Sequence, residues 1–404
     1  MKEQVKLQVT MMGMGYIGLP TAALIASKGI KVNGVDVNKQ VVDTINKGKI
    51  HIVEPDLEGL VHLAVRKGNL KASLKPVNSD VFLIAVPTPF KKSHQPDLSF
   101  VVKAAKMVIP FLREGNLFII ESTSPVGTTE RIARLIYKER PELKSKIHIA
   151  YCPERVLPGS VIYELQQNDR VIGGIDEAST QAAVKFYSRF VKGNLHQTNS
   201  RTAEMTKLVE NAYRDVNIAF ANELSMICDE AGINVNELIR LASKHPRVKI
   251  LQPGPGVGGH CIAVDPWFIA TAFPSQAKII RLAREVNTLK TEWVITKIKQ
   301  EVKNLELKIG RKPVVACMGL TYKADIDDLR ESPALEIFES LKKSKLSVLA
   351  VEPNIREHKK ISVTDTAVAL KQADILVFLV NHKEFSSLGI NGKIILDFCG
   401  INTK

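Results

Sequence analysis

The feature that most constrains the fold is a glycine-rich turn close to the start of the chain. A strand-like run over residues 5–12 leads into Gly13-Met14-Gly15-Tyr16-Ile17-Gly18, and a helical run to Ser27 and a second strand-like run over residues 31–35 follow. This order, with G-x-G-x-x-G opening the helix, is typical of a dinucleotide site. There the glycines allow a tight turn, close contact with a pyrophosphate and packing of the helix on the strand, and the N–H groups at the helix N-terminus receive the phosphate.

An acidic residue indicates which dinucleotide is expected. Asp36 ends the second strand-like run. A carboxylate at this position can bind a ribose 2′-hydroxyl and would repel a 2′-phosphate, so the sequence favours NAD over NADP. The predicted cofactor contacts in this segment are Gly13, Gly15, Tyr16, Ile17, Gly18 and Asp36.

The rest of the first half repeats the alternation of strands and helices, which predicts a doubly wound parallel sheet. Its further strand-like runs are residues 81–86, 117–121, 147–151 and 170–174. Ligands of such sheets bind beyond the carboxyl ends of the strands, where four candidate residues lie: Pro87, Thr88, Thr123 and Glu154. These residues could also have purely structural roles. Thr88 and Thr123 could form turns or cap a helix that begins near Thr128, and Glu154 could form a surface salt bridge.

A long helical pattern occupies the middle of the chain. It runs over residues 201–231, stops at Gly232 and is apolar on most faces, as expected of a helix buried between domains or subunits. Lys207 and Asn211 lie four residues apart and share one face. They could direct two donors at developing oxygen charge, although Lys207 could also be a snorkelling lysine at a domain edge.

The stretch Gly254–Asp265 combines four glycines with a thiol and a carboxylate. The glycines would let the backbone approach a ligand closely. Asp265 and Pro266 indicate a helix start, with Asp265 as N-cap. Cys261 lies just before that start and is a candidate for a lowered pKa. The alternative is a structural glycine turn with a buried, inert cysteine.

The last hundred residues repeat the α/β pattern, with strand-like runs at residues 314–318, 346–351, 375–380 and 394–397. Gly319 is a single glycine and not a full fingerprint, so a second nucleotide-binding unit with different phosphate chemistry is expected. Lys323 and Arg330 could contact phosphates or pair with the acids beside them. The polar, lysine-rich segment 303–312 suggests a domain boundary.

Composition excludes several classes of protein. The N-terminal residues have no apolar signal core and no apolar run approaches the length of a membrane span. The five cysteines are widely spaced without a C-x-x-C pair, which argues against a zinc site or a disulfide scaffold. The net charge is +14, but the basic residues are scattered, which favours steering of a small anionic substrate over nucleic-acid binding. A cytoplasmic protein without a metal, a membrane or a nucleic-acid partner is expected.

Taken together, these motifs resemble the UDP-glucose/GDP-mannose dehydrogenase family over essentially the whole chain. The matching segments are residues 13–18, 86–89, 121–129, 153–155, 207–211, 256–265 and 323–333. Residues 152–159 and 245–261 resemble most the branch that acts on UDP-N-acetylhexosamines. The UDP-glucose branch carries a second Glu four residues after the first, where this chain has Pro158. The resemblance implies UDP-N-acetyl-D-mannosamine as the substrate, with UDP-N-acetylglucosamine or GDP-mannose as the alternative.

The resemblance implies three domains and a homodimer whose core is the helix at residues 201–231. The expected domains are an NAD-binding Rossmann domain at 1–198, a helical central domain with the cysteine loop at 199–303, and a Rossmann-like UDP-sugar domain at 304–404. It also implies a four-electron oxidation of a sugar C6 alcohol to a carboxylate with two NAD. An aldehyde cannot release a second hydride until something adds to its carbonyl, and a thiolate can add to form a thiohemiacetal and then a thioester.

The resemblance assigns roles to individual residues. Cys261 would be the nucleophile, Lys207 and Asn211 would stabilise oxyanions, and Asp265 would orient or deprotonate the hydrolytic water, which Glu154 and Thr123 would hold. The substrate contacts would be Arg155, Val156, Leu157, Lys207, Asn211, Arg247 from the neighbouring subunit, Gly258 and Lys323, with Arg330 near the cofactor. Two rivals remain: a two-electron sugar dehydrogenase or epimerase, and an NAD-sensing protein without catalysis.

Overall fold

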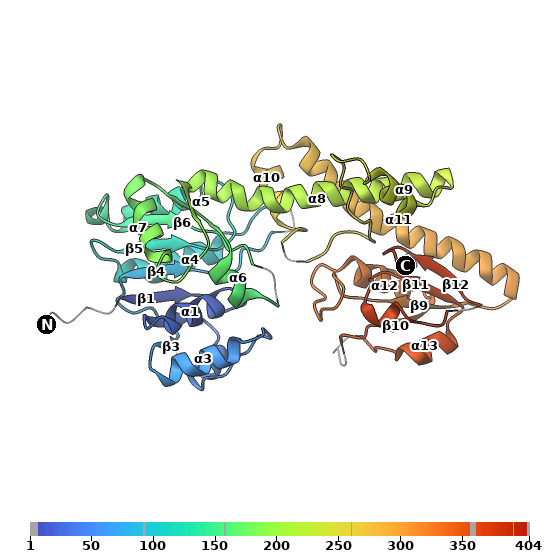
Figure 1. The fold of residues 1–404 in the computed structure, drawn as a ribbon, viewed down its shortest axis with the longest axis horizontal. Helices are drawn as coiled ribbons and strands as arrows, with labels where there is room; N and C mark the ends of the chain where they lie inside the picture. The colour runs from blue at the N-terminus through green and yellow to red at the C-terminus, as the bar shows by residue number, and fades with distance from the viewer. Residues whose placement is uncertain are drawn as a thin grey trace. The chain divides into compact units, whose positions relative to one another are not determined.

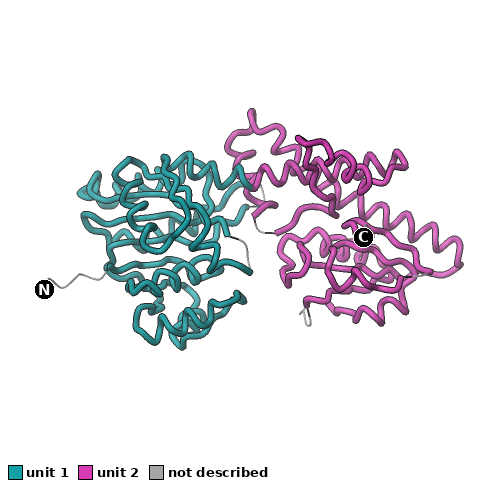
Figure 2. Tube along the Cα trace, in the orientation of Figure 1, with its two compact units in different colours: residues 1–210 teal, residues 211–404 magenta. Residues whose placement is uncertain are grey.

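The computed structural model divides the chain into two compact units, residues 1–210 and residues 211–404 (Figures 1 and 2). It describes residues 7–91, 94–156, 159–259, 261–355, 361–390 and 392–401.

The first unit is built around one sheet, whose strand order within the described residues is β3-β2-β1-β4-β5-β6-β7-β8. Neighbouring strands are parallel except β6 and β7, which are antiparallel. The strands are β1 Gln8–Met12, β2 Lys31–Val35, β3 Leu70–Ser73, β4 Val81–Ile84, β5 Leu117–Ile120, β6 His148–Tyr151, β7 Arg170–Gly174 and β8 Leu195–Asn199. The α-helices are α1 Gly18–Ser27, α2 Lys39–Asn46, α3 Leu57–Arg66, α4 Ser99–Val108, α5 Thr128–Glu139, α6 Val161–Gln167 and α7 Glu177–Tyr187, with 3-10 turns at Ile109–Phe111 and Pro141–Leu143.

The central strands are buried on both faces, which explains why they are continuous apolar runs. All residues of β4 and β5 are buried, and the alternating side chains of β4 enter two separate cores. Leu83 belongs to one core, and Phe82 and Ile84 belong to the other. A parallel sheet with a core on each face is the doubly wound arrangement that the sequence predicts.

Parallel pairing also places the candidate loops together. β1, β4, β5 and β6 are consecutive parallel neighbours, so their carboxyl ends lie at one edge of the sheet. The loops that follow them carry Gly13–Gly18, Pro87 and Thr88, Thr123, and Glu154. The first unit therefore gathers these predicted residues at one edge.

The second unit combines helices with a smaller parallel sheet of order β10-β9-β11-β12. Its strands are β9 Val314–Met318, β10 Ser347–Val351, β11 Ile375–Phe378 and β12 Ile394–Asp397. The helices are α9 Val235–Ala242, α10 Asp265–Ala272, α11 Lys278–Ile309, α12 Pro333–Lys343 and α13 Thr366–Gln372, with a 3-10 turn at Lys383–Phe385. The long helix α8, Ser200–Ala231, begins in the first unit and ends in the second.

The lysine-rich segment 303–312, expected as a boundary, is largely helical. Helix α11 continues to Ile309 and ends at Gly310, which has φ +68°. Val302 is buried and Leu305 packs on the core of the second unit, while the lysines occupy more exposed positions. The segment is thus the amphipathic end of a helix, and its polarity reflects an exposed face and not a linker.

Among the described residues, none of the helices combines the length and the apolarity needed to span a bilayer.

Candidate functional site

The glycine turn after β1 has the geometry of a dinucleotide site. Gly13 has φ +90°, and a Cβ there would lie 2.5 Å from the carbonyl oxygen of Ala85. A Cβ on Gly18 would collide with the carbonyl oxygen of Gly13, whereas a Cβ on Gly15 would meet no atom within 4 Å. Gly13 and Gly18 are therefore required by the protein's own packing, and Gly15 leaves open backbone where a phosphate can approach.

Asp36, the predicted ribose contact, directly follows β2 and is bonded to the glycine turn. One carboxylate oxygen accepts the Met14 N–H at 3.0 Å and the other accepts the Asn38 N–H at 2.9 Å. The side chain is half-buried, so it ties the glycine turn to the end of β2 and keeps acceptor capacity for a ligand. Tyr16 is 50% exposed, and Ile17 directly precedes α1. These residues fit an NAD cofactor.

The serine and threonine loop after β5 is fixed by protein contacts. The Ser122 hydroxyl accepts from the Val86 N–H at 2.9 Å and donates to the Val86 carbonyl at 2.7 Å, which joins the loops after β4 and β5. Helix α5 begins at Thr128, as predicted, but a distant residue caps it. Glu204 of α8 accepts the N–H groups of Gly127 at 2.6 Å and Thr129 at 2.7 Å. Thr123 is half-buried and is free of a capping role in this helix start.

Glu154 is part of a buried charged cluster and not of a surface salt bridge. Its Oε2 accepts from Arg170 Nη1 at 2.8 Å and its Oε1 accepts the Arg155 N–H at 2.7 Å. The Glu154 and Arg170 side chains are 8% and 2% exposed. Pairing with a buried guanidinium fixes the orientation of the Glu154 carboxylate.

Glu121, at the end of β5, belongs to the same cluster. Tyr187 of α7 donates to its Oε1 at 2.6 Å, and Oε2 has no hydrogen-bond partner among the described residues. Burial raises the pKa of Glu121 to about 7, against the opposing effect of Arg170. Arg170, Tyr187 and Glu121 were not predicted from sequence. An arginine at the start of the otherwise apolar run Arg170–Gly174 is the signal that could have found them, since a buried charge requires a partner.

The segment after Glu154 makes contacts within the first unit. Arg155 forms an ion pair with Glu210 of α8, at 2.7 Å from Nη2 to Oε1. Val156 packs against one of the two cores. Leu157 and Pro158 lie outside the described residues. The predicted substrate role of this segment is not tested by these contacts and stays a prediction.

Cys261 is the exposed member of the five cysteines. Cys152, Cys228 and Cys317 are buried and Cys399 is intermediate. Burial raises the pKa of Cys152 and of Cys317 to about 12, so both stay protonated at neutral pH. Cys261 is thus the cysteine most accessible to a reactant, as a reactive thiol must be.

Asp265 has a different local role from the one predicted. It is the first residue of α10, and Val264 in the N-cap position provides no side-chain cap. The Asp265 carboxylate is 4% exposed and accepts from the Asn211 amide at 2.5 Å, while its own N–H donates to the Cys261 carbonyl at 2.8 Å. The N-cap expectation is therefore wrong, and Asp265 instead links Asn211 of α8 with the backbone of the cysteine. Lys207, half-buried, lies one turn before Asn211 on α8.

The glycines before Cys261 are required by packing against another loop of the second unit. A Cβ on Gly259 would lie 2.8 Å from the Tyr322 ring, and one on Gly258 would collide with the carbonyl oxygen of Glu331. The Gly259 N–H donates to the Arg330 carbonyl at 3.1 Å. These glycines therefore allow the cysteine loop to pack closely on residues 322–331. From the sequence, they were expected to let the backbone approach a ligand.

The remaining predicted contacts of the second unit are solvent-accessible. Lys323 and Arg247 are exposed. Arg330 forms a two-pronged ion pair with Asp328, with its Nη2 2.6 Å from Oδ2. This pairing is the alternative that the sequence left open for Arg330.

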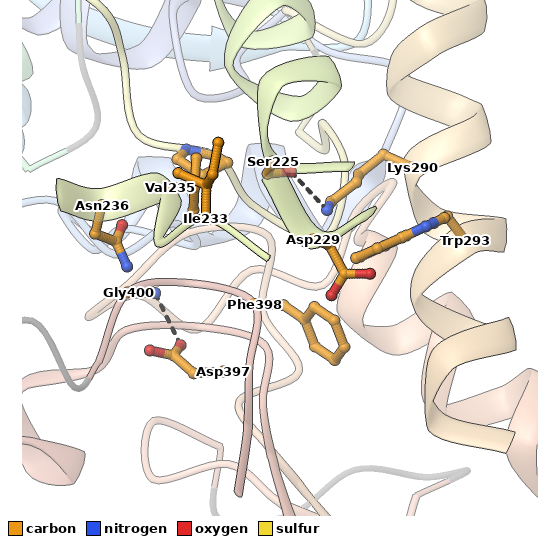
Figure 3. A pocket seen from close by; sticks show the side chains of 11 residues that line it. Ser225, Asp229, Ile233, Val235, Asn236, Lys290, Trp293, Asp397, Phe398 and Gly400 are labelled. Carbon is orange, nitrogen blue, oxygen red and sulfur yellow. Dashed lines mark hydrogen bonds between the residues drawn. The ribbon is translucent and has the colours of Figure 1, made fainter. Parts of the chain in front are cut away.

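A cavity of about 160 Å³ lies elsewhere in the second unit (Figure 3). Asp229 of α8, Trp293 of α11 and Phe398 after β12 line it together. Lys290, 2% exposed, donates to the Ser225 hydroxyl at 2.7 Å and lies 3.8 Å from the centroid of the Trp293 ring. Burial lowers the pKa of Lys290 to about 7.

The lowered pKa makes stability depend on Lys290 in a defined pH range. Folded Lys290 loses its proton near pH 7, whereas an unfolded lysine loses it near pH 10.5. Between these pH values the unfolded state binds more protons, so the free-energy cost of burying the charged lysine falls as the pH rises. We expect Lys290→Met to raise the free energy of unfolding by about 2 kcal/mol at pH 6 and by less at pH 9. Urea denaturation at both pH values measures this. Lys297→Met, at an exposed ion pair with Asp229, is the control; an equal gain from both variants would refute the role of burial.

Comparison with known proteins identifies the family. Three family models match in order: the NAD binding domain over residues 7–191, the central domain over 201–289 and the UDP binding domain over 316–404, all of the UDP-glucose/GDP-mannose dehydrogenase family. The chain belongs to this family. It is therefore an NAD-dependent nucleotide-sugar dehydrogenase, as the sequence predicts, and the UDP binding domain indicates a UDP-sugar as the substrate.

Relatives with known names cover nearly the whole chain. The chain is 53% identical to the UDP-N-acetyl-D-mannosamine dehydrogenase of Campylobacter jejuni, over 97% of this chain and 99% of that protein. It is 51% identical to the NDP-N-acetyl-D-galactosaminuronic acid dehydrogenase of Ralstonia nicotianae, over 97% and 96%. Among solved structures, the UDP-N-acetyl-mannosamine dehydrogenase Cap5O of S. aureus has a TM-score of 0.88 at 40% identity, over 98% and 99% of the two chains. The predicted fold class is thereby confirmed.

Proposed function

We propose that this enzyme oxidises the C6 hydroxyl of UDP-N-acetyl-D-mannosamine to a carboxylate through a covalent intermediate on Cys261. The observation that carries the proposal is the arrangement in the second unit. Cys261 has an exposed thiol and its carbonyl accepts the Asp265 N–H, while the Asp265 carboxylate accepts from the Asn211 amide at 2.5 Å. This combines a nucleophile, an acid–base group and an oxyanion donor on adjoining elements.

The chemistry assigned to these residues follows from their types. The Cys261 thiolate adds to the aldehyde carbon, a C–S bond forms, and the carbonyl electron pair moves to oxygen, where Asn211 and Lys207 stabilise it. Loss of the second hydride leaves a thioester. Water, oriented by Asp265, attacks this carbon, the C–S bond breaks, and the thiolate is restored.

The first unit supplies the residues that hold the cofactor and the water. Gly13–Gly18, Asp36, Thr88 and Thr123 fit NAD. When bound, NAD supplies the hydride acceptor, so one alcohol and one water yield one carboxylate while two NAD are reduced and three protons are released. Because Glu154 is paired with Arg170, we assign it the positioning of the hydrolytic water and not the removal of its proton.

A homodimer formed through α8 is part of the proposal. Val209, Tyr213, Phe220 and Ile227 of this helix are 48%, 69%, 54% and 53% exposed. Their spacing of four, seven and seven residues places them along one side of the helix. An apolar stripe of this kind on a surface favours burial against a second copy. The exposed Arg247 is then available to a neighbouring subunit.

The identity of the sugar is a separate question. The chain is about equally identical to a relative named as a UDP-N-acetyl-D-mannosamine dehydrogenase and to one named as an NDP-N-acetyl-D-galactosaminuronic acid dehydrogenase. These identities favour a UDP-N-acetylhexosamine as the substrate, and the configuration of the sugar is decided by the rates below. Initial rates of NADH formation with UDP-N-acetylmannosamine, UDP-N-acetylglucosamine, UDP-N-acetylgalactosamine, UDP-glucose and GDP-mannose test the proposal. We expect the highest kcat/KM with UDP-N-acetylmannosamine. A higher value with another of these sugar nucleotides would contradict the proposed substrate and favour that sugar instead.

Asp36 is expected to determine the preference for NAD. We predict that Asp36→Ala lowers the ratio of kcat/KM with NAD to kcat/KM with NADP by about 10- to 100-fold, because the ribose acceptor and the charge that repels a 2′-phosphate are both lost. Asp43→Ala is the control, since Asp43 pairs with Lys39 on the exposed face of α2. A ratio unchanged from the parent enzyme would remove the ribose role from Asp36.

A further inference from the structure

The two sheets carry an acidic residue at the same topological position. Asp36 follows β2 and Glu352 follows β10, and each of these strands pairs in parallel with the first strand of its sheet. The glycines that follow those first strands, Gly13 and Gly319, both have φ +90°. Each donates its N–H at 2.8 Å to the carbonyl of the residue before the acid. The second unit therefore repeats the turn geometry of the dinucleotide site.

The two acids differ in what they bind. Asp36 accepts one N–H on each oxygen and is half-buried. Glu352 is 3% exposed. Its Oε2 accepts the N–H groups of Leu320 at 2.7 Å and Thr321 at 3.1 Å, and its Oε1 accepts the Asn354 N–H at 3.0 Å. Glu352 is thus turned inward onto the loop after β9, and a ribose cannot reach it.

His382 completes this arrangement. Its Nδ1 accepts the Asp325 N–H at 3.0 Å, which places the ring proton on Nε2, 3.1 Å from Glu352 Oε2. Both side chains are 0% exposed. Asp325 and Glu384 also bring carboxylates near His382, but the two ring nitrogens already have protein partners, which favours a structural role over a metal site.

The segment Leu320–Asp325 is therefore held at both ends. Glu352 binds its first two N–H groups and His382 binds its last. Between them, the Thr321 hydroxyl donates to the Lys323 carbonyl at 2.9 Å, and Tyr322 packs on Gly259. Lys323, next to Tyr322, and Asp325 are the exposed residues of this segment, and the others are buried or half-buried.

We propose that Glu352 and His382 are positioning residues that fix the segment Leu320–Asp325 and so present Lys323 to the diphosphate of the nucleotide sugar. This inference rests on the proposed function, because it needs a nucleotide diphosphate at Lys323. It deepens that function by assigning substrate affinity to a buried pair that does not touch the substrate.

A substitution that keeps the shape of Glu352 tests the proposal. Both carboxylate oxygens accept backbone N–H groups, whereas the amide of Glu352→Gln has one acceptor and must turn its NH₂ toward a backbone donor. We expect the Kd for UDP, measured by titration calorimetry, and the KM for the sugar nucleotide to rise about tenfold, or about 1.4 kcal/mol. We expect kcat to change less than threefold and the Kd for NAD to stay the same.

Controls separate the possible outcomes. Glu384→Gln removes an exposed carboxylate beside His382 and should change nothing. If circular dichroism shows that Glu352→Gln does not fold, His382→Asn, which keeps an acceptor for Asp325, should raise the Kd for UDP about threefold. Unchanged UDP affinity and KM in a folded variant would overturn this inference alone. A parent enzyme that neither binds UDP nor oxidises a UDP-sugar would overturn the proposed function as well.

Discussion

Cys261→Ser is expected to lower kcat for carboxylate formation by about three orders of magnitude while the Kd for NAD changes less than twofold. A serine hydroxyl is not ionised at neutral pH, so the adduct that the second oxidation requires forms far more slowly. The first oxidation needs no nucleophile, so alcohol oxidation should fall much less than carboxylate formation. The Gly13–Gly18 turn and Asp36 lie in the first unit, so NAD binding should also be retained. Stopped-flow NADH absorbance and titration of NAD measure the two effects.

The other cysteines provide a matched control. Cys399→Ser alters a thiol of intermediate exposure whose pKa is raised by burial, and kcat should stay within about twofold of the parent. Intact-protein mass spectrometry during turnover should show an adduct that is present in the parent and absent from Cys261→Ser. Carboxylate formation by Cys261→Ser at the parental rate would rule out the thioester route.

Arg170→Met is expected to destabilise the protein by about 3 to 5 kcal/mol, because it leaves a buried carboxylate without its cation. Arg170 donates to Glu154 at 2.8 Å and to the Leu165 carbonyl at 3.3 Å, and its guanidinium lies 5.6 Å from the centroid of the Tyr187 ring. Without it, Glu121 loses the cation that opposes the rise of its pKa and takes up a proton more readily. The folded variant then binds more protons than the unfolded chain above about pH 4.5, so its loss of stability should be larger at pH 8 than at pH 5.

An exposed arginine pair provides the comparison. Arg201 makes a similar two-pronged contact with Glu130, at 2.6 and 2.8 Å, but its side chain is 63% exposed. Arg201→Met should destabilise the protein far less than Arg170→Met, because solvent screens an exposed ion pair. Urea denaturation of both variants at pH 5 and pH 8 provides the measurement, and equal losses for the two would show that burial of Arg170 is not the cause.

Local patterns in the sequence predicted most of the fold. Apolar runs such as Val81–Ile84 and Leu117–Ile120 are buried strands because their periodicity is a local property. The same is true of the glycine turn at Gly13 and of the 32-residue helix α8. The polarity of the segment 303–312 belongs largely to the exposed face at the end of helix α11, and the domain boundary expected there stays a prediction.

The contacts that shape the candidate site join residues that lie far apart in the chain. Glu204 caps a helix more than 70 residues earlier, and Arg170 at the start of β7 pairs with Glu154 in the loop after β6. Neither residue belongs to a motif that reveals its partner. The glycines before Cys261 were recognised, but their partner is Tyr322, which only the folded chain brings near. Sequence therefore indicates the chemistry of the site better than the contacts that hold it.

The central claim is a four-electron oxidation, and the amount of NADH formed per UDP-N-acetylhexosamine consumed tests it most directly. Complete conversion of a limiting amount of UDP-N-acetylmannosamine, with NADH read by absorbance and sugar nucleotide by chromatography, gives this ratio. We predict a ratio of two, with a uronate as the product. A ratio of one, with an aldehyde or ketone as the product, would contradict the account and leave Cys261 without a catalytic role.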